Sequence, residues 1–274
     1  MKPIYEPSGR AREYGELAVN IYTGCNHGCS YCYARKMKKR WTRSGEPCAF
    51  DSPEPRPGIA EAVGRQLERA KITRRTIFLC FACDPYPVNI DTTPTREVIQ
   101  AIKDSGNNVR ILTKGGDRAR RDFDLLGPSD WFGVTVSGND QREPNAAPET
   151  ERILTLKDAN ALGINTWVSC EPVLEPRRVL AAIRHLDFID LFKIGKLNHE
   201  KTPLEVERFG GWAAFGKEAE RLCRKHGRGY YIKEDLHAEM ERAAWKNSEL
   251  KRILDDEMKK ADGGAAQPLA MPGA

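Results

Sequence analysis

The chain has 274 residues, and 40% of them are hydrophobic, which is enough for the core of one large α/β domain or two small ones. The formal net charge is +5, from 44 basic and 39 acidic residues, so an anionic partner is permitted but nucleic acid is not required. No apolar run approaches the ~20 residues that cross a bilayer, and the first ten residues lack the apolar stretch of a signal peptide. We therefore expect a cytoplasmic protein without a membrane partner.

Six short apolar runs, rich in β-branched and aromatic residues, alternate with amphipathic stretches along the chain. They span 17–22, 76–82, 108–113, 131–136, 165–170 and 188–194. Several runs are apolar on both faces, as buried parallel strands are. Six strand–helix units are fewer than the eight of a closed barrel, so the pattern predicts an α/β fold, an open partial (β/α)6 barrel with a C-terminal helical extension.

Composition also predicts how the chain divides. The barrel domain is expected over 1–234, a charged C-terminal helix over 235–260, and a disordered tail over 261–274, where glycine, alanine and proline dominate. Proline-rich segments at 44–58 and 138–148 indicate loops.

The most informative motif follows the first predicted strand. Cys25, Cys29 and Cys32 lie within eight residues, with Gly24 directly before the first of them and Gly28 directly before the second. In a reducing compartment, such a group indicates metal or redox chemistry more than disulfides. Thiolates are the ligands of iron–sulfur clusters, and three ligands for a four-iron cube leave one iron open. The alternative is a zinc site completed by His27, which is more typical of a small module than of the first loop of an α/β enzyme.

This C-x3-C-x-aromatic-C spacing resembles the motif of the radical S-adenosylmethionine superfamily. The resemblance implies a 4Fe–4S cluster on the three cysteines, with S-adenosylmethionine chelating the open iron. One electron from the cluster would split the sulfonium, and the resulting 5′-deoxyadenosyl radical would abstract hydrogen from the substrate. It also implies an external one-electron reductant such as flavodoxin or ferredoxin.

Further segments are similar to the spore photoproduct lyase-like branch of that superfamily. They are CSYCY at 29–33, DPY at 84–86, ILTK at 111–114, VTVS at 134–137, EP at 143–144, AP at 147–148 and Arg152. The similarity extends over roughly residues 20–198. The sequence departs from that branch in the cysteines before Asp84, which read Cys80-Phe81-Ala82-Cys83, so the DNA-lesion substrate is not transferred with the resemblance.

Cofactor contacts are expected from Tyr31, Cys83, Asp84, Lys114 and Ser137, because sites in such folds form at the carboxyl ends of strands. Asp84 suits the methionyl ammonium, and its alternative role is a turn. Lys114 suits the methionyl carboxylate, and otherwise is a solvated lysine. Ser137 suits the ribose or carboxylate, or else forms a turn. Tyr31 would pack against the adenine through its backbone. The resemblance supports Lys114 and Ser137.

Cys83 is also the candidate catalytic residue, since a thiol donates a hydrogen atom readily, although its simpler role is to fill space. Cys170 is the rival donor. Cys80 and Cys83 form a C-x2-C pair, but positions three apart on a strand face opposite sides, so they would cooperate in a second metal site only if the strand ended between them. Glu171, at the end of the fifth strand, is interpreted as either a salt-bridge partner or a catalytic group.

Basic runs at 35–43 and 118–121 either contact nucleic acid or form solvated faces, the commoner case. Lys193 and Lys196 either hold an anionic substrate or are structural.

The sequence leaves three functions open. The first is a radical enzyme, lyase-like or modifying, that acts on nucleic acid. The second is a radical enzyme that acts on a peptide or small metabolite, and the third is a zinc-dependent nucleic-acid-binding protein. The oligomeric state is not predicted.

Overall fold

The computed structural model describes residues 2–41 and 49–262. Its strands form one sheet in the order β1-β2-β3-β4-β5-β6-β7-β8. The strands are β1 Ile4–Tyr5, β2 Leu17–Val19, β3 Thr76–Leu79, β4 Asn108–Thr113, β5 Trp131–Thr135, β6 Asn165–Cys170, β7 Leu191–Ile194 and β8 Tyr230–Ile232. The α-helices are α1 Tyr33–Trp41, α2 Ile59–Arg69, α3 Thr93–Asp104, α4 Glu149–Ala161, α5 Pro176–His185, α6 Leu204–Arg208, α7 Gly211–Lys225 and α8 Glu234–Asp262. Short 3-10 helices are η1 Gly9–Glu13, η2 Ala49–Asp51, η3 Gly116–Leu125 and η4 Asp140–Arg142.

The open partial barrel predicted from the sequence is confirmed. The six predicted strands are β2 to β7, and each pairs with the next in parallel register. Two further strands extend the sheet beyond that prediction: β1 pairs with β2 antiparallel, and β8 pairs with β7 in parallel. Both are only two or three residues long, so neither carries enough alternation to be recognised from the sequence.

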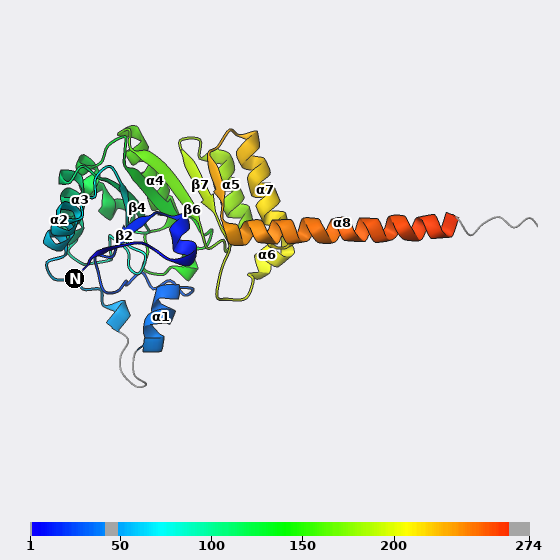
Figure 1. The fold of residues 1–274 in the computed structure, drawn as a ribbon, viewed down its shortest axis with the longest axis horizontal. Helices are drawn as coiled ribbons and strands as arrows, with labels where there is room; N and C mark the ends of the chain where they lie inside the picture. The colour runs from blue at the N-terminus through cyan, green and yellow to red at the C-terminus, as the bar shows by residue number, and fades with distance from the viewer. Residues whose placement is uncertain (1, 42–48, 263–274) are drawn as a thin grey trace, which may run out of the picture.

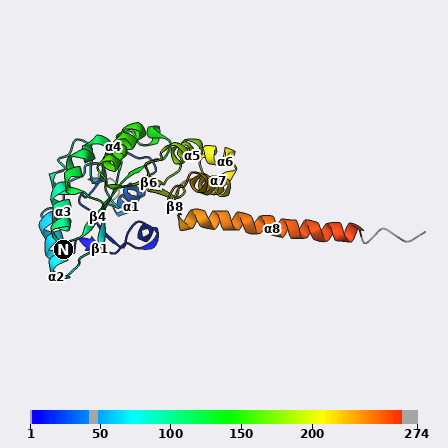
Figure 2. The ribbon, with the colours of Figure 1, turned by 90° about the horizontal axis from the view of Figure 1, so that it is seen from above.

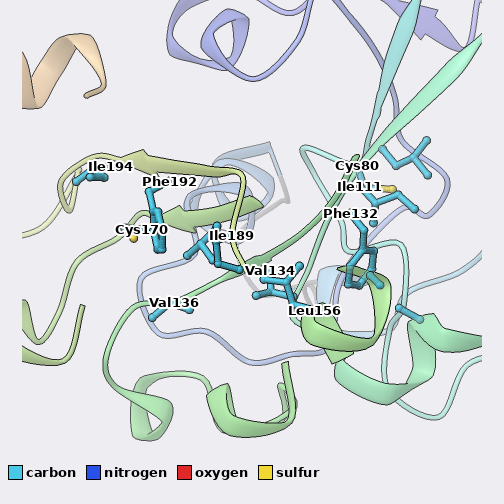
Figure 3. Close-up of a cluster of buried hydrophobic side chains, with 14 of the residues drawn as sticks. Cys80, Ile111, Phe132, Val134, Val136, Leu156, Cys170, Ile189, Phe192 and Ile194 are labelled. Carbon is cyan, nitrogen blue, oxygen red and sulfur yellow. The ribbon is translucent and has the colours of Figure 1, made fainter. Parts of the chain in front are cut away.

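The helices form an arc outside the strands, and the arc is open on one side (Figure 2). Alternate residues of each strand face the helices, because successive side chains point to opposite faces of a sheet. Ile111, Phe132, Val134, Phe192 and Ile194 belong to this outer core together with the apolar faces of the helices (Figure 3).

A smaller aromatic cluster fills the interior of the barrel. It consists of Tyr14, Ala18, Phe78 and Trp167, with Phe81 and Leu112 packed against it. Gly133 on β5 makes room for it, since a Cβ there would overlap the indole of Trp167. The Trp167 Nε1 donates a hydrogen bond to the Ile111 carbonyl at 3.0 Å, which satisfies the buried indole N–H.

The N-terminal segment crosses the open side of the arc, between β1 and the start of α8 (Figure 2). Tyr14 reaches the barrel interior and hydrogen bonds to Ser169 Oγ, at 3.1 Å. Glu13 accepts hydrogen bonds from the Tyr231 hydroxyl, at 3.1 Å, and from the Glu234 backbone, at 3.0 Å. The segment therefore joins the two edges of a sheet that its own strands do not close.

Helix α8 projects away from the barrel beyond its contacts with α7 (Figure 1). Its bounds, Glu234–Asp262, cover the helix expected at 235–260. Most of the expected tail, 263–274, part of the expected loop, 44–48, and the end of the first basic run, 42–43, lie outside the described residues. Within the described chain, no helix combines the length and the apolar character that a membrane span requires.

Candidate iron–sulfur and cofactor site

The cysteine loop connects β2 to α1 and is fixed by backbone contacts. Cys25 N–H donates to the Phe50 carbonyl at 2.8 Å, an approach possible because a Cβ at Gly24 would collide with that carbonyl. Gly28 has φ +74°, a conformation that glycine adopts without strain. Asn26 exchanges two hydrogen bonds with the backbone of Val88, at 2.7 and 2.9 Å. The loop is thereby held against the segment that follows β3.

The three thiols are half-buried and line one cavity. Burial raises the pKa of Cys25 and Cys29, and Asp84 adds to the effect at Cys25, while Lys114 opposes it at Cys29. The Cys32 sulfur accepts a hydrogen bond from the Arg35 backbone N–H, at 3.4 Å, in the first turn of α1. A sulfur that already accepts an N–H is suited to a thiolate ligand, since such bonds tune iron–sulfur centres.

Among the described residues, the three cysteines and His27 are not arranged as a preformed zinc site. Ligands of one zinc at ~2.3 Å bonds have sulfurs roughly 4 Å apart. A metal site needs at least three Asp, Glu, His or Cys side chains whose ligand atoms lie close together. Among the described residues, Asp140, Glu143 and Glu149 have such atoms within 4.8 Å of one another, and the three cysteines do not. His27 is buried with Nδ1 3.5 Å from the Asp84 carboxylate and Nε2 3.4 Å from Arg118. A four-iron cube binds each thiolate to a separate iron, so wider spacing suits it.

The cavity has a volume of about 400 Å³, within the usual range of small-molecule sites, about 300–1,000 Å³. It lies where the parallel strands end. Its walls include the three cysteines, residues at the ends of β3 to β8, and η1. Of the predicted cofactor contacts, Tyr31, Cys83, Asp84 and Lys114 line it.

Lys114, directly after β4, places a charge inside this cavity. Its Nζ donates to Thr135 Oγ1 at 3.3 Å and lies 5.8 Å from the centre of the Tyr31 ring. None of the ion pairs within 4.0 Å among the described residues includes it. Burial lowers the pKa of Lys114, but Glu143 and Cys29 outweigh this and raise it overall. The residue is therefore a cation without a bound carboxylate.

Tyr31 is held by a buried ion pair. Its hydroxyl donates to Glu143, whose other oxygen accepts from Arg152 at 2.5 Å. Both charged side chains are fully buried. Burial opposes ionisation of Glu143, yet Lys114 and Arg152 hold its pKa below the usual value. Arg152 also donates to the Ala147 and Thr135 carbonyls, at 2.6 and 2.9 Å, which satisfies a guanidinium that would otherwise be costly to bury.

Asp84 has the turn-forming role that the sequence analysis gave as its alternative. Its Oδ1 accepts hydrogen bonds from the Tyr86 backbone at 2.9 Å and Thr113 Oγ1 at 2.6 Å. Its Oδ2 accepts the Lys114 backbone N–H at 2.9 Å. The carboxylate thus ties the loop after β3 to the end of β4 and positions Lys114. A contact with a ligand ammonium stays a prediction.

The strand-end condition for the cysteine pair is met. β3 ends at Leu79, and Cys80 has φ +69°, so the chain turns and both Cys80 and Cys83 line the cavity. Burial raises the pKa of Cys80, and the neighbouring Cys83 thiol raises it further. Cys170, the rival hydrogen donor, belongs instead to the outer core and is not among the cavity-lining residues.

Ser137 is fully buried and is likewise not among the residues that line the cavity. Its backbone N–H and its hydroxyl both pair with Glu149 Oε1, at 2.6 and 3.2 Å. Thr135, two positions earlier, lines the cavity instead. A contact between Ser137 and a cofactor stays a prediction that this position does not favour.

The structure adds two polar residues, Tyr14 and Lys233, that the sequence did not indicate. Tyr14 and Lys233 both reach Glu171 Oε2, each at 2.5 Å, and all three line the cavity. Glu171 is therefore a salt-bridge partner. Lys193 donates to the Glu13 carbonyl, and burial, then Arg110, lowers its pKa to about 8. Because Tyr14 and Lys233 stand 157 and 62 positions from Glu171, no local motif marks them.

Four cations of the two basic runs form ion pairs within the protein. Arg120 contacts Asp117 and Asp158, and Arg121 contacts Asp122. In α1, Arg35 pairs with Asp51 and Lys36 pairs with Glu200, at 2.6 and 2.7 Å. These pairs support the simpler interpretation of the two runs, as charged faces of the folded protein.

Solved structures with the same architecture define the class of fold. A spore photoproduct lyase complexed with dinucleoside spore photoproduct matches with a TM-score of 0.64 and 13% identity, over 84% of this chain and 79% of the lyase. Streptococcus suis SuiB bound to S-adenosylmethionine matches with a TM-score of 0.55 and 11% identity, over 78% of this chain and 49% of SuiB. The chain thus has the radical S-adenosylmethionine partial-barrel fold with a spore photoproduct lyase-like structural relationship, as the sequence predicted.

The chain belongs to the family described as "Protein of unknown function (DUF5131)", whose model matches residues 11–226. Uncharacterized protein MJ0683 of Methanocaldococcus jannaschii is 29% identical over 167 residues, 58% of this chain and 61% of that protein. Uncharacterized protein ORF301 of Acidianus two-tailed virus is 25% identical over 191 residues, 64% of this chain and 62% of that protein. The matches span about three fifths of these relatives.

Proposed function

We propose that the protein is a radical S-adenosylmethionine enzyme in which Cys25, Cys29 and Cys32 hold a 4Fe–4S cluster. The observation that carries the proposal is the opening of three thiols from one loop into a cavity that also contains Lys114, a cation with no ion pair within 4.0 Å among the described residues. When bound, the cluster and the cofactor supply reductive cleavage of a sulfonium and, from it, hydrogen-atom abstraction from a substrate. The donor set fits this group, because thiolates are its ligands.

The chain's own residues bind, orient and exclude water. Lys114 pairs with the methionyl carboxylate, and Asp84 holds the Lys114 backbone in place through the 2.9 Å hydrogen bond. Tyr31, fixed by Glu143, contributes the wall beside the cysteines. The aromatic interior keeps the base of the cavity dry, which protects reactive groups from side reactions.

The test is anaerobic reconstitution followed by iron, sulfide and zinc analysis and by assay of cofactor cleavage. We expect about four irons per chain. After chemical reduction of the cluster, we expect slow formation of methionine and 5′-deoxyadenosine from S-adenosylmethionine, even without substrate. Cys25→Ala, Cys29→Ala and Cys32→Ala should each lose both. Cys223→Ala is the matched control, because Cys223 is buried in α7 and is not among the cavity residues. Colourless protein with stoichiometric zinc would refute the proposal.

We further propose that an external reductant, such as flavodoxin or ferredoxin, supplies the electron. For the substrate, the lyase neighbour was solved with a dinucleoside lesion and SuiB with a precursor peptide. Nucleic acid is the first candidate. Its test is binding of single- and double-stranded DNA or RNA as salt is raised, because phosphate contacts make log affinity fall linearly with log salt. Salt-insensitive binding, or none, would direct the search to a peptide or small metabolite.

A further inference from the structure

The wall of the cavity formed by the ends of β6, β7 and β8 is a second polar centre. It contains Glu171, Asn198 and Lys233, with Arg10 and Lys196 beside them. Five strands separate β2, which leads to the cysteine loop, from β8, which leads to Lys233. This β6–β8 wall therefore offers contacts separate from those assigned to the cluster and the methionyl group.

The charges on the β6–β8 wall are already balanced. Each cation that lines it has a carboxylate within hydrogen-bonding distance. The pairs are Arg10–Asp235 at 3.2 Å, Lys196–Glu239 at 2.6 Å and Lys233–Glu171 at 2.5 Å. An anionic ligand such as a phosphate or carboxylate would have to compete with these pairs, and removing one partner of a buried pair is costly. The wall therefore favours an uncharged ligand group.

Glu171 has an acceptor oxygen with spare capacity. An ionised carboxylate has about four acceptor positions. Oε2 accepts from both the Lys233 ammonium and the Tyr14 hydroxyl, at 2.5 Å. Within the described part of the chain, Oε1 accepts a single hydrogen bond, a long one of 3.4 Å from the Asn198 amide. Lys233 and Tyr14 thus fix the carboxylate and leave Oε1 to accept from a ligand.

The surroundings of Glu171 add an apolar surface. Phe81 stacks on Phe78 with ring centres 4.2 Å apart and planes at 20°, and Leu112 and Leu197 line the same cavity. A flat apolar surface beside a fixed acceptor suits a planar ligand group that presents an N–H.

We infer that Glu171 is a substrate-binding residue whose Oε1 accepts a hydrogen bond from an uncharged N–H or O–H group, as in an amide, an imide or an alcohol. The inference rests on the proposed function in assigning the cofactor to the cysteine wall and the substrate to the β6–β8 wall. Lys233 and Tyr14 are positioning residues, since they act through Glu171. The ligand donor has two possible sources, the substrate and the hydroxyls or amine of the cofactor itself, and the experiment separates them.

The experiment measures binding of three small probes by ligand-observed NMR titration. Benzamide presents an uncharged N–H, acetophenone replaces that NH2 with a methyl group of similar size, and benzoate presents an anion. The protein is the reconstituted full chain with saturating S-adenosylmethionine. We expect benzamide to bind at least about tenfold more tightly than acetophenone, because hydrogen bonds to charged groups contribute this much, and benzoate to bind most weakly.

The variant Glu171→Gln sharpens the result. With Lys233 and Tyr14 still donating, the Gln oxygen must face them, so its NH2 group takes the place of Oε1 and presents a donor instead of an acceptor. The preference for benzamide over acetophenone should disappear or reverse. Glu218→Gln is the matched control, because Glu218 pairs with Arg221 on the surface of α7. It should leave the preference unchanged.

Three results would overturn the assignment. The first is equal binding of benzamide and acetophenone to the wild-type protein, and the second is tighter binding of benzoate. The third is a benzamide preference that vanishes when S-adenosylmethionine is added, since Glu171 would then contact the cofactor. The same titration on metal-free protein, without cofactor, tests the role of Glu171 independently of the proposed radical chemistry. A chain that loads no iron refutes the radical enzyme, while the Glu171-dependent preference is still measured.

Discussion

Replacement of Lys114 tests the electrostatics of the cofactor site most directly. Its ammonium lies inside the cavity, donates to Thr135 Oγ1 at 3.3 Å, and forms no ion pair among the described residues. Burial lowers its pKa, but Glu143 and Cys29 raise it above the usual value, so the side chain is charged at pH 7. Lys114→Met keeps the length and removes the charge. An anionic group bound there would lose its counter-charge in a partly desolvated site.

The expected loss is on the order of 2–5 kcal/mol, the cost of leaving one member of a buried charge pair alone. This corresponds to a Kd for S-adenosylmethionine that is higher by roughly 30- to 5,000-fold. Isothermal titration of the iron-loaded protein measures it. Lys114→Arg, which keeps the charge, should recover part of the affinity, and Lys217→Met, at an exposed position of α7, should change nothing. A Kd for Lys114→Met within twofold of wild type would remove Lys114 from the site.

Three other outcomes follow from the same structure. Glu143→Gln should lower the free energy of unfolding in urea by about 3–5 kcal/mol, because the buried Arg152 loses its 2.5 Å ion pair and keeps only the 3.6 Å contact with Asp140; an unchanged midpoint would contradict this. Burial, then Arg110, lowers the pKa of Lys193 from 10.5 to about 8. Lys193 therefore loses its proton at a lower pH in the folded protein than in the unfolded chain. Stability should therefore rise between pH 8 and 10.5, by roughly 3 kcal/mol, and Lys193→Met should abolish that rise. Cys83→Ala should keep the cluster and cofactor cleavage but lose the normal product, whereas Cys170→Ala should not; normal product from Cys83→Ala would exclude Cys83 as the hydrogen donor.

The parts of the fold that the sequence predicts are those that local patterns specify. Most of the strands β2 to β7 are apolar runs, because burial on both faces requires apolar residues at successive positions whatever the neighbouring strands are. β4 instead alternates between buried and half-buried positions. The cysteine loop is similarly local, since Cys25 and Cys32 are only seven positions apart and α1 starts at the next residue. The position of Lys114 directly after β4 is predictable because the end of that strand is visible in the sequence.

Side-chain direction beyond a strand end was harder to predict. Ser137 and Lys114 occupy comparable positions, yet Ser137 turns to the start of α4, where Glu149 accepts its hydrogen bonds. That partner depends on how the loop 138–148 folds back, which no periodicity describes. The same holds for Asp84, whose carboxylate serves the backbone of Tyr86 and Lys114.

Contacts between residues that are far apart in the chain could not be predicted from the sequence. In the sequence, Tyr14 and Lys233 are isolated polar residues. Only the folded structure brings them, directly after η1 and β8, within hydrogen-bonding distance of Glu171. Isolated polar residues become informative when burial makes their pairing obligatory. Burial at these positions depends on the tertiary structure.

The crossing of the open side by the N-terminal segment has a consequence for biosynthesis. Glu13 finds its partner Glu234 only 221 positions later. At about 5–20 residues per second, the ribosome needs roughly 10 to 45 s to make the intervening chain. The cysteines at 25–32 emerge from the ribosome at the start of that interval, before β8 and the start of α8 have been made. For the cluster of the proposed function, metal delivered during synthesis would reach the cysteine loop before the contact between Glu13 and Glu234 can form.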